Sequence, residues 1–288
     1  MTPEDRNYLA HHGILGMKLG VRRYQNRDGT LTAAGKKKAE QYTNNGTNYS
    51  GDDYTLKKGT KFQRIGTADE TDTHQRTYVT YDKDDNRYYV GLAGEAINGN
   101  KKISLTSKED LHIANGKSLV NAYTQLLSSL PASVLSEPEK GTQLTKENKK
   151  EIKELQKIYK NALTDQESFD KSYNTFQAQL MKDTTASRQY FNILREKGYN
   201  AMIDYNDNKG LMQNVFSKSP LIVFDRGNSL KTTSIKEITT KEKDDAQAWY
   251  EKKWNNSSYS KITKMMLDNE TKQDEIASFV NKFLVSLV

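Results

Sequence analysis

The chain has 288 residues, of which 34% are hydrophobic and 28% charged, and it carries a formal net charge of +7 at pH 7. It contains no cysteine, which excludes a disulfide framework and thiolate chemistry. It also lacks an apolar run of about 20 residues and an apolar secretory signal, so we expect no membrane span. The composition predicts a modest core with long polar arms.

Residues 1–55 carry glycines throughout, and "QYTNNGTNYSGDDY" is typical of a linker. Glycines at this density disfavour a helix. We therefore predict an extended basic N-terminal arm and linker over 1–55.

Short β-branched and aromatic runs between turn residues then predict strands. They are "KKGTKFQRIG", "RTYVTYD" (76–82), "KKISLTS" (101–107), "YNAMIDY" (199–205) and "PLIVFD" (220–225). The last run is apolar throughout, which predicts a strand buried on both faces.

Helical spacing of apolar residues dominates from about 117 to 197, and Gly198 suits a left-handed helix end. Two stripes predict core-facing sides, one of Ile152, Leu155, Ile158 and Tyr159, the other of Phe169, Tyr173, Phe176 and Leu180. We predict an α+β fold. A small mixed sheet over 56–239 is split by this helical insertion, and helices over 240–288 dock on the domain or on another copy.

Familiar catalytic and metal-binding patterns are missing from the sequence. His11 and His12 are adjacent, so they cannot share a helix face, and His74 and His112 have no partner at ligand spacing. There is no phosphate-binding loop, nucleophile elbow or zinc-protease helix. We predict that the chain binds no metal.

The segment "HHGILGMKLGVRRYQNRDGTLTAAGKKK" (11–38) resembles the HGxxGMKWGxRRxQxxDGxLTxxG signature of proteins from phages and prophages of Gram-positive bacteria, often encoded among head and structural genes. It covers about a tenth of the chain, and Leu19 stands where the pattern has tryptophan. The resemblance implies a virion protein that works with phage structural proteins.

Glycine-spaced hydrophobes followed by cations suit a peptide that docks in a groove or against a polyanion such as DNA. The alternative is a disordered arm without a partner. We take residues 11–38 as a recognition peptide, with these partner-binding residues: His12, Gly13, Gly16, Met17, Gly20, Arg22 and Arg23.

The order of "GTKFQRIG", "RTYVTYDKDDNRYYVG", "KKISLTSKEDLHIAN", "LREKGYNAMIDYND" and "SPLIVFDRGNSLK" is similar to a divergent ADP-ribosyltransferase-like domain. The resemblance implies that Arg64 holds the phosphate of NAD, that Thr80 braces the nicotinamide side, and that Tyr88 or Tyr89 lies on the helix that follows. The family's late glutamate has no counterpart, because Ser219 and Pro220 precede "LIVFD". Asp204 and Asp207 are nearby acids in a stretch typical of a turn.

Three functions follow. The first, which we favour, is a virion protein that is capsid-interior, portal-proximal or ejected. It forms a homo-oligomer or is present in several copies in the virion, and it is in the host cytoplasm during assembly. It binds other virion proteins or DNA through its arm and needs no cofactor. The second is an enzyme that uses NAD to modify a host protein, and the third is an anti-defence binder without enzymatic activity.

Overall fold

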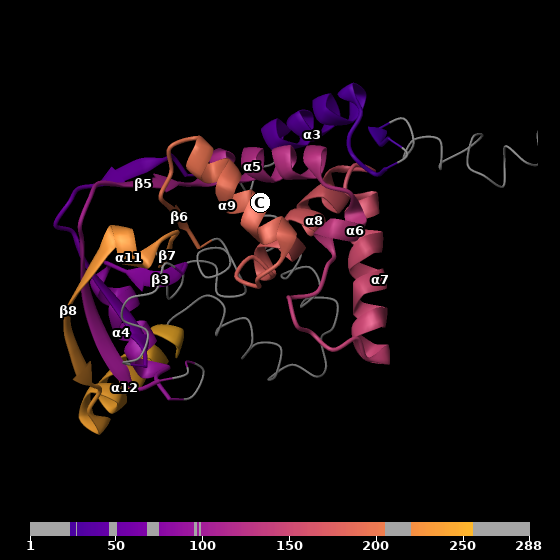
Figure 1. Ribbon diagram of the computed structural model, residues 1–288. Helices are drawn as coiled ribbons and strands as arrows, with labels where there is room; N and C mark the ends of the chain where they lie inside the picture. Colours follow the sequence, from indigo (N-terminus) through magenta and orange to yellow (C-terminus); the bar gives the residue numbers. More distant parts are fainter. Residues whose placement is uncertain are drawn as a thin grey trace, which may run out of the picture. The chain divides into compact units, whose positions relative to one another are not determined.

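The computed structural model describes residues 24–26, 28–45, 51–67, 75–94, 97, 99–204 and 220–255 (Figure 1). They divide into two compact units, which are described one at a time. The helical unit combines the described residues up to 54 with 114–199, and the sheet unit combines 55–113 with the described residues from 200 onward. The α+β class predicted from the sequence is confirmed.

The helical unit contains six helices in its described part: α3 (Ala33–Asn45), α5 (Gly116–Ser129), α6 (Ala132–Leu135), α7 (Lys146–Asn161), α8 (Gln166–Ala178) and α9 (Thr185–Glu196). Side chains cap the first turns of four of them. Asn115, Thr145, Asp165 and Thr184 each accept a hydrogen bond from a backbone N–H at the helix start. After α9, Gly198 takes the predicted left-handed conformation, with φ 89°.

Aromatic rings fill the core of the helical unit. The Tyr123 ring on α5 has its centroid 5.3 Å from Tyr173 and 5.3 Å from Phe176, both on α8. Phe176 in turn lies 5.1 Å from Tyr190 on α9. The predicted core role of the α8 stripe is confirmed, because its residues are at most 3% exposed.

The buried tyrosine hydroxyls of this core differ in their hydrogen bonds. Tyr123 donates to the Ser172 hydroxyl at 2.9 Å, and Tyr190 donates to the Leu119 carbonyl at 3.0 Å. The Tyr159 hydroxyl, 1% exposed as a residue, has no partner among the described residues. Burial raises the pKa of Tyr159, so it stays protonated.

The sheet unit holds an eight-stranded sheet, larger than the sequence predicts, in the order β1-β5-β6-β7-β3-β2-β4-β8. Its strands are β1 (Tyr54–Leu56), β2 (Lys61–Gly66), β3 (Thr77–Thr80), β4 (Lys101–Ser107), β5 (Leu111–Ala114), β6 (Ala201–Ile203), β7 (Pro220–Val223) and β8 (Leu230–Glu237). Each pair of neighbouring strands in the part β6-β7-β3-β2-β4-β8 is antiparallel. Every residue of β7 is buried, which confirms its predicted position inside the sheet.

Two helices cover one face of this sheet, while α11 (Arg226–Ser229) is a short turn before β8. They are α4 (Lys83–Gly91) and α12 (Thr240–Asn255), which pack on β2 through a cluster of Ile65, Val90, Ala93 and Ala246. The Lys102 ammonium on β4 contacts the Glu242 carboxylate of α12 at 2.5 Å. An apolar cluster and an ion pair therefore attach α12 to the sheet.

Several elements differ from the sequence predictions. Residues 33–45, expected in an extended arm, form helix α3, and strands β1, β5 and β8 were not predicted. β8 is polar and exposed along most of its length, so it lacks the apolar alternation that marks a strand. The helices predicted beyond Asn255 lie outside the described residues.

Replacing Tyr159 by phenylalanine removes a buried hydroxyl that has no partner in the described structure. We expect the free energy of unfolding to stay unchanged or to rise by up to about 1 kcal/mol. Tyr123→Phe is the matched control, because it removes a hydroxyl that is bonded to Ser172, and it should lower stability by about 1–2 kcal/mol. Urea unfolding of both variants measures the difference; equal losses would contradict this account.

Glu242→Gln tests the attachment of α12 through its pH dependence. The hydrogen bond from Lys102, followed by that from the Thr239 N–H, lowers the pKa of Glu242 from 4.5 to about 2. A depressed pKa contributes stability above pH 4.5 that is lost as the pH falls towards 2. The variant should therefore lose less stability than the wild type across this window, as acid titration followed by circular dichroism would show. Parallel acid curves would rule out the carboxylate as the source.

Candidate functional site

The second half of the 11–38 signature is folded. Gln25 and Leu31 form an antiparallel bridge, and the Asn26 N–H donates to the Thr30 carbonyl at 2.7 Å. The Thr32 N–H donates back to the Tyr24 carbonyl at 3.0 Å. We call residues 24–26 and 28–35 the anchor segment.

The "DG" of the signature forms the turn of the anchor segment. The Asp28 carboxylate accepts hydrogen bonds from the Thr30 N–H at 2.9 Å and from the Thr30 hydroxyl at 2.7 Å. Both hydrogen bonds lower the pKa of Asp28, the one from the Thr30 N–H more than the one from the Thr30 hydroxyl. Gly29 has φ 91°, and a Cβ there would lie 2.9 Å from the Pro131 Cβ. Glycine is therefore required both by the backbone and by the neighbour.

The "LTxxG" of the signature starts helix α3. Leu31 is 5% exposed, and the Thr32 hydroxyl accepts a hydrogen bond from the Gly35 N–H at 3.1 Å, as a helix cap does. A Cβ on Gly35 would lie 2.0 Å from the Tyr24 carbonyl oxygen, so only glycine lets the two backbones approach. The turn, the helix cap and the close backbone approach therefore explain why the signature has these residue types between Asp28 and Gly35.

Helix α3 fixes the anchor segment to the helical unit. Ala39 is fully buried, and Tyr42 packs its ring 5.7 Å from that of Phe169. The Lys38 ammonium lies over the rings of Tyr24 at 4.4 Å and Tyr42 at 5.5 Å. Of the recognition peptide expected over 11–38, the described residues 24–26 and 28–38 are folded. Residues 1–23, which we call the leader, lie outside the described residues.

The predicted partner-binding residues all fall in the leader. They lie outside the described residues: His12, Gly13, Gly16, Met17, Gly20, Arg22 and Arg23. The anchor segment begins one residue after Arg23.

The residues implied by the transferase resemblance lie on β2, β3 and α4. The Thr80 hydroxyl, in a residue that is 6% exposed, hydrogen-bonds the Asn86 side chain on α4. Gln63 also donates to the Asn86 carbonyl, at 3.3 Å. Arg64 donates to the Tyr78 carbonyl on β3 at 3.4 Å.

Arg64 and Thr80 point to opposite faces of the sheet. Gln63 is the direct antiparallel partner of Thr80, so these two side chains share a face, the one that α4 covers. Arg64 follows Gln63 on the strand and therefore points to the other face. The structure does not bring Arg64 and Thr80 into one pocket.

The remaining described residues of that resemblance lie on α4 and directly after β6. Tyr88 lies on α4, on the Thr80 side, with its ring 5.2 Å from that of Tyr89. Asp204 is 5% exposed, and its N–H donates to the Pro220 carbonyl at 2.8 Å. Asp207 and Ser219 lie outside the described residues.

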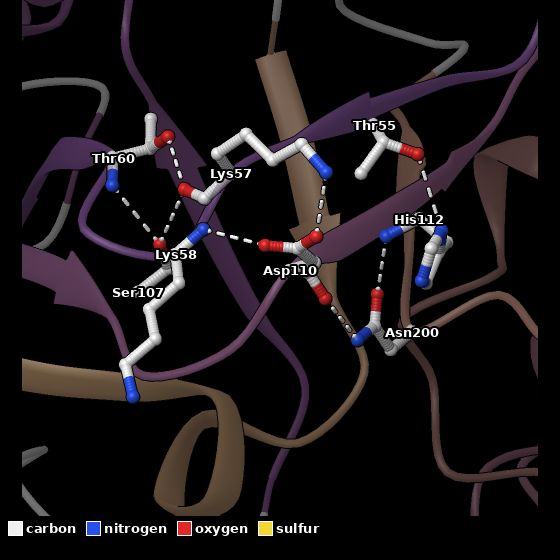
Figure 2. A network of polar contacts seen from close by, with 8 residues as sticks. All are labelled: Thr55, Lys57, Lys58, Thr60, Ser107, Asp110, His112 and Asn200. Atoms are coloured by element: carbon white, nitrogen blue, oxygen red, sulfur yellow. Dashed lines mark hydrogen bonds and ion pairs between the residues drawn. The ribbon is translucent and has the colours of Figure 1, made fainter.

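Sequence reasoning missed a network of polar residues in the sheet unit (Figure 2). It joins the turn before β2 to the turn between β4 and β5. The Asp110 carboxylate contacts the Lys57 ammonium at 2.9 Å and accepts from the Lys58 N–H at 2.9 Å. The hydrogen bond from the Lys57 side chain lowers the pKa of Asp110 most, and the hydrogen bond from the Lys58 N–H lowers it further.

Asn200 completes this network from the segment before β6. Its side chain accepts from the His112 N–H at 2.7 Å and donates to the Asp110 carbonyl at 3.0 Å and to the Glu109 carboxylate at 3.1 Å. The His112 ring in turn lies 3.1 Å from the Thr55 hydroxyl. Because these groups bind one another, the network acts as a clamp that fixes strand ends. A pattern of short polar residues at turns is its only sequence signal.

Within the described residues, no cluster of three or more histidines and carboxylates could hold a metal ion. No helix there is both long enough and apolar enough to cross a bilayer.

Comparison with protein-family models, with curated proteins and with solved structures finds no match to this chain. The proposals below therefore depend on the residues and their geometry.

Gly29→Ala tests the contact between the anchor segment and the helical unit. Gly141 has nearly the same φ, 89°, in the same unit, but a Cβ there meets nothing within 4 Å. Alanine should cost about 1–2 kcal/mol at either position because of the left-handed backbone. Gly29→Ala should cost at least about 1 kcal/mol more, because Pro131 must move. Equal losses on thermal unfolding would show that the Pro131 contact has no energetic weight.

Proposed function

We propose that this chain is a bacteriophage virion component without enzymatic activity, capsid-interior, portal-proximal or ejected, that docks on another protein of the particle through residues 12–23. The observation that carries the proposal is the folded anchor segment. It accounts structurally for the second half of the signature, while the glycines, hydrophobic residues and arginines of the first half have the chemistry of a docking peptide. A leader held by a rigid base is the arrangement expected of a docking peptide.

The chemistry of the leader supports a protein groove as its target. Glycines at 13, 16 and 20 alternate with hydrophobic residues, which suits close backbone approach to a surface. Arg22 and Arg23 then supply forked guanidinium donors beside the anchor, suited to carboxylates at the rim of such a groove. The resemblance to phage structural-gene products supplies the particle as the place where this partner is found.

The transferase alternative is weakened by the sheet. Transfer of ADP-ribose requires Arg64 and Thr80 to contact one dinucleotide, and the register of β2 and β3 turns them to opposite faces. A late glutamate that matches the family is also missing from the sequence. We therefore propose that any kinship of the sheet unit with that family is one of fold, without its activity.

Removal of residues 1–23 tests the docking role. The shortened chain keeps the described contacts of the anchor segment and α3, so it should still unfold cooperatively on heating. It should be lost from purified particles when it replaces the full chain, as mass spectrometry of the particles would show. Undiminished incorporation would contradict the proposal.

A charge-matched pair of variants refines this test. Arg22→Gln with Arg23→Gln should reduce incorporation at least several-fold. Lys36→Gln with Lys37→Gln removes the same charge from exposed positions of α3 and should leave incorporation unchanged. Two further outcomes would overturn the proposal: a soluble host partner without particle association, or release of nicotinamide from NAD that Arg64→Ala abolishes.

A further inference from the structure

Helix α7 carries a stripe of lysines along one side. Its sequence, KENKKEIKELQKIYKN, contains six lysines and three glutamates. At about 100° per residue, the six lysines fall within an arc of about 100° around the helix axis. We call this set the lysine stripe: Lys146, Lys149, Lys150, Lys153, Lys157 and Lys160.

The lysine stripe faces solvent, and the three glutamates of α7 lie outside its arc. All six residues are exposed, and none takes part in an ion pair of the described structure. Three pairs of these lysines are spaced i,i+4, at 146/150, 149/153 and 153/157. Each such pair opposes helix formation by a few tenths of a kcal/mol. A surface that serves only solubility has its two charge signs interspersed instead.

The other side of α7 is used for packing. Tyr159 is 1% exposed, Ile152, Leu155 and Ile158 are half-buried, and the helix packs against α6 and α8. Figure 1 shows α7 at the margin of the helical unit, beside α6 and α8. A helix that lies in a membrane surface needs its apolar side free to enter the lipid. In α7 that side is engaged, so the lysine stripe is left to act through charge alone.

We propose that the lysine stripe binds the phosphate backbone of double-stranded DNA. From Lys146 to Lys160 the helix rises by about 21 Å. Over that length one DNA strand presents about six phosphates, which matches the six lysines in number and extent. The stripe includes no aromatic residue and no arginine, so it offers neither base stacking nor forked contacts to base edges. Binding is therefore independent of sequence.

This inference concerns a surface outside the leader and does not depend on the proposed docking function. DNA binding is measured on the purified full chain, whereas docking is measured by incorporation into particles. Either can fail without the other.

The test compares two triple variants by fluorescence anisotropy with a fluorescein-labelled mixed-sequence duplex. Lys149, Lys153 and Lys157→Gln removes half of the stripe. Lys117, Lys171 and Lys197→Gln removes the same charge from scattered exposed positions of the helical unit. Glutamine keeps the helix propensity of lysine, and both variants retain the leader, so circular dichroism and thermal unfolding should match the wild type.

We expect the stripe variant to bind the duplex at least tenfold more weakly at physiological salt. The slope of log K against log salt concentration should fall in magnitude by about 2.7, because three phosphate contacts are lost. The scattered variant should change the affinity less than threefold. Equal losses in the two variants, or no binding by the wild type, would overturn the proposal. Stripe-dependent binding that is tighter to phosphatidylserine vesicles or to polyglutamate than to the duplex would also overturn it.

Discussion

The direct pairing of Gln63 with Thr80 is the constraint from which the arrangement of the sheet unit follows. Because of this pairing, the side chains of Gln63 and Thr80 point to one face of the sheet and that of Arg64 points to the other. Ile65, two residues beyond Gln63, shares the face that carries α4 and anchors the cluster with α12. Lys102 is paired with Ile65 on β4, so it meets Glu242 on this same side. A shift of one residue in this register would exchange the buried and exposed sets.

Much of the fold could be predicted from the sequence where burial alternates strongly. The alternation of Ile103 and Leu105 marks β4 with correct bounds, and the apolar run of β7 indicates a buried strand. Helix α3 differs from the predicted extended arm because the glycines of 1–55, Gly35 among them, disfavour a helix. The structure shows that Gly35 is there for the close approach of the Tyr24 carbonyl. A single sequence does not distinguish these two uses of glycine.

The candidate sites show the same limit. Arg64 and Thr80 were placed on the correct strands, but their faces depend on a register that no local pattern encodes. The sequence of α7 carries two patterns at once, the apolar stripe and the six lysines beside it. The sequence predicts the apolar stripe of α7 as core-facing, and the burial of Tyr159 places the lysines on the exposed side. The polar clamp around Asn200 joins segments far apart in the sequence, so its partners could not be paired in advance.

Residues 114–199 of the helical unit are inserted between two neighbouring strands, because β5 ends at Ala114, β6 begins at Ala201, and the two are adjacent in the sheet. The Asn200 N–H donates to the His112 carbonyl at 3.2 Å, so the ends of the insertion meet. Closing so long a loop from an unfolded chain costs entropy before any strand contact is gained. An insertion that folds early and holds its ends together removes that cost. We therefore expect that weakening the helices also slows the closure of the sheet.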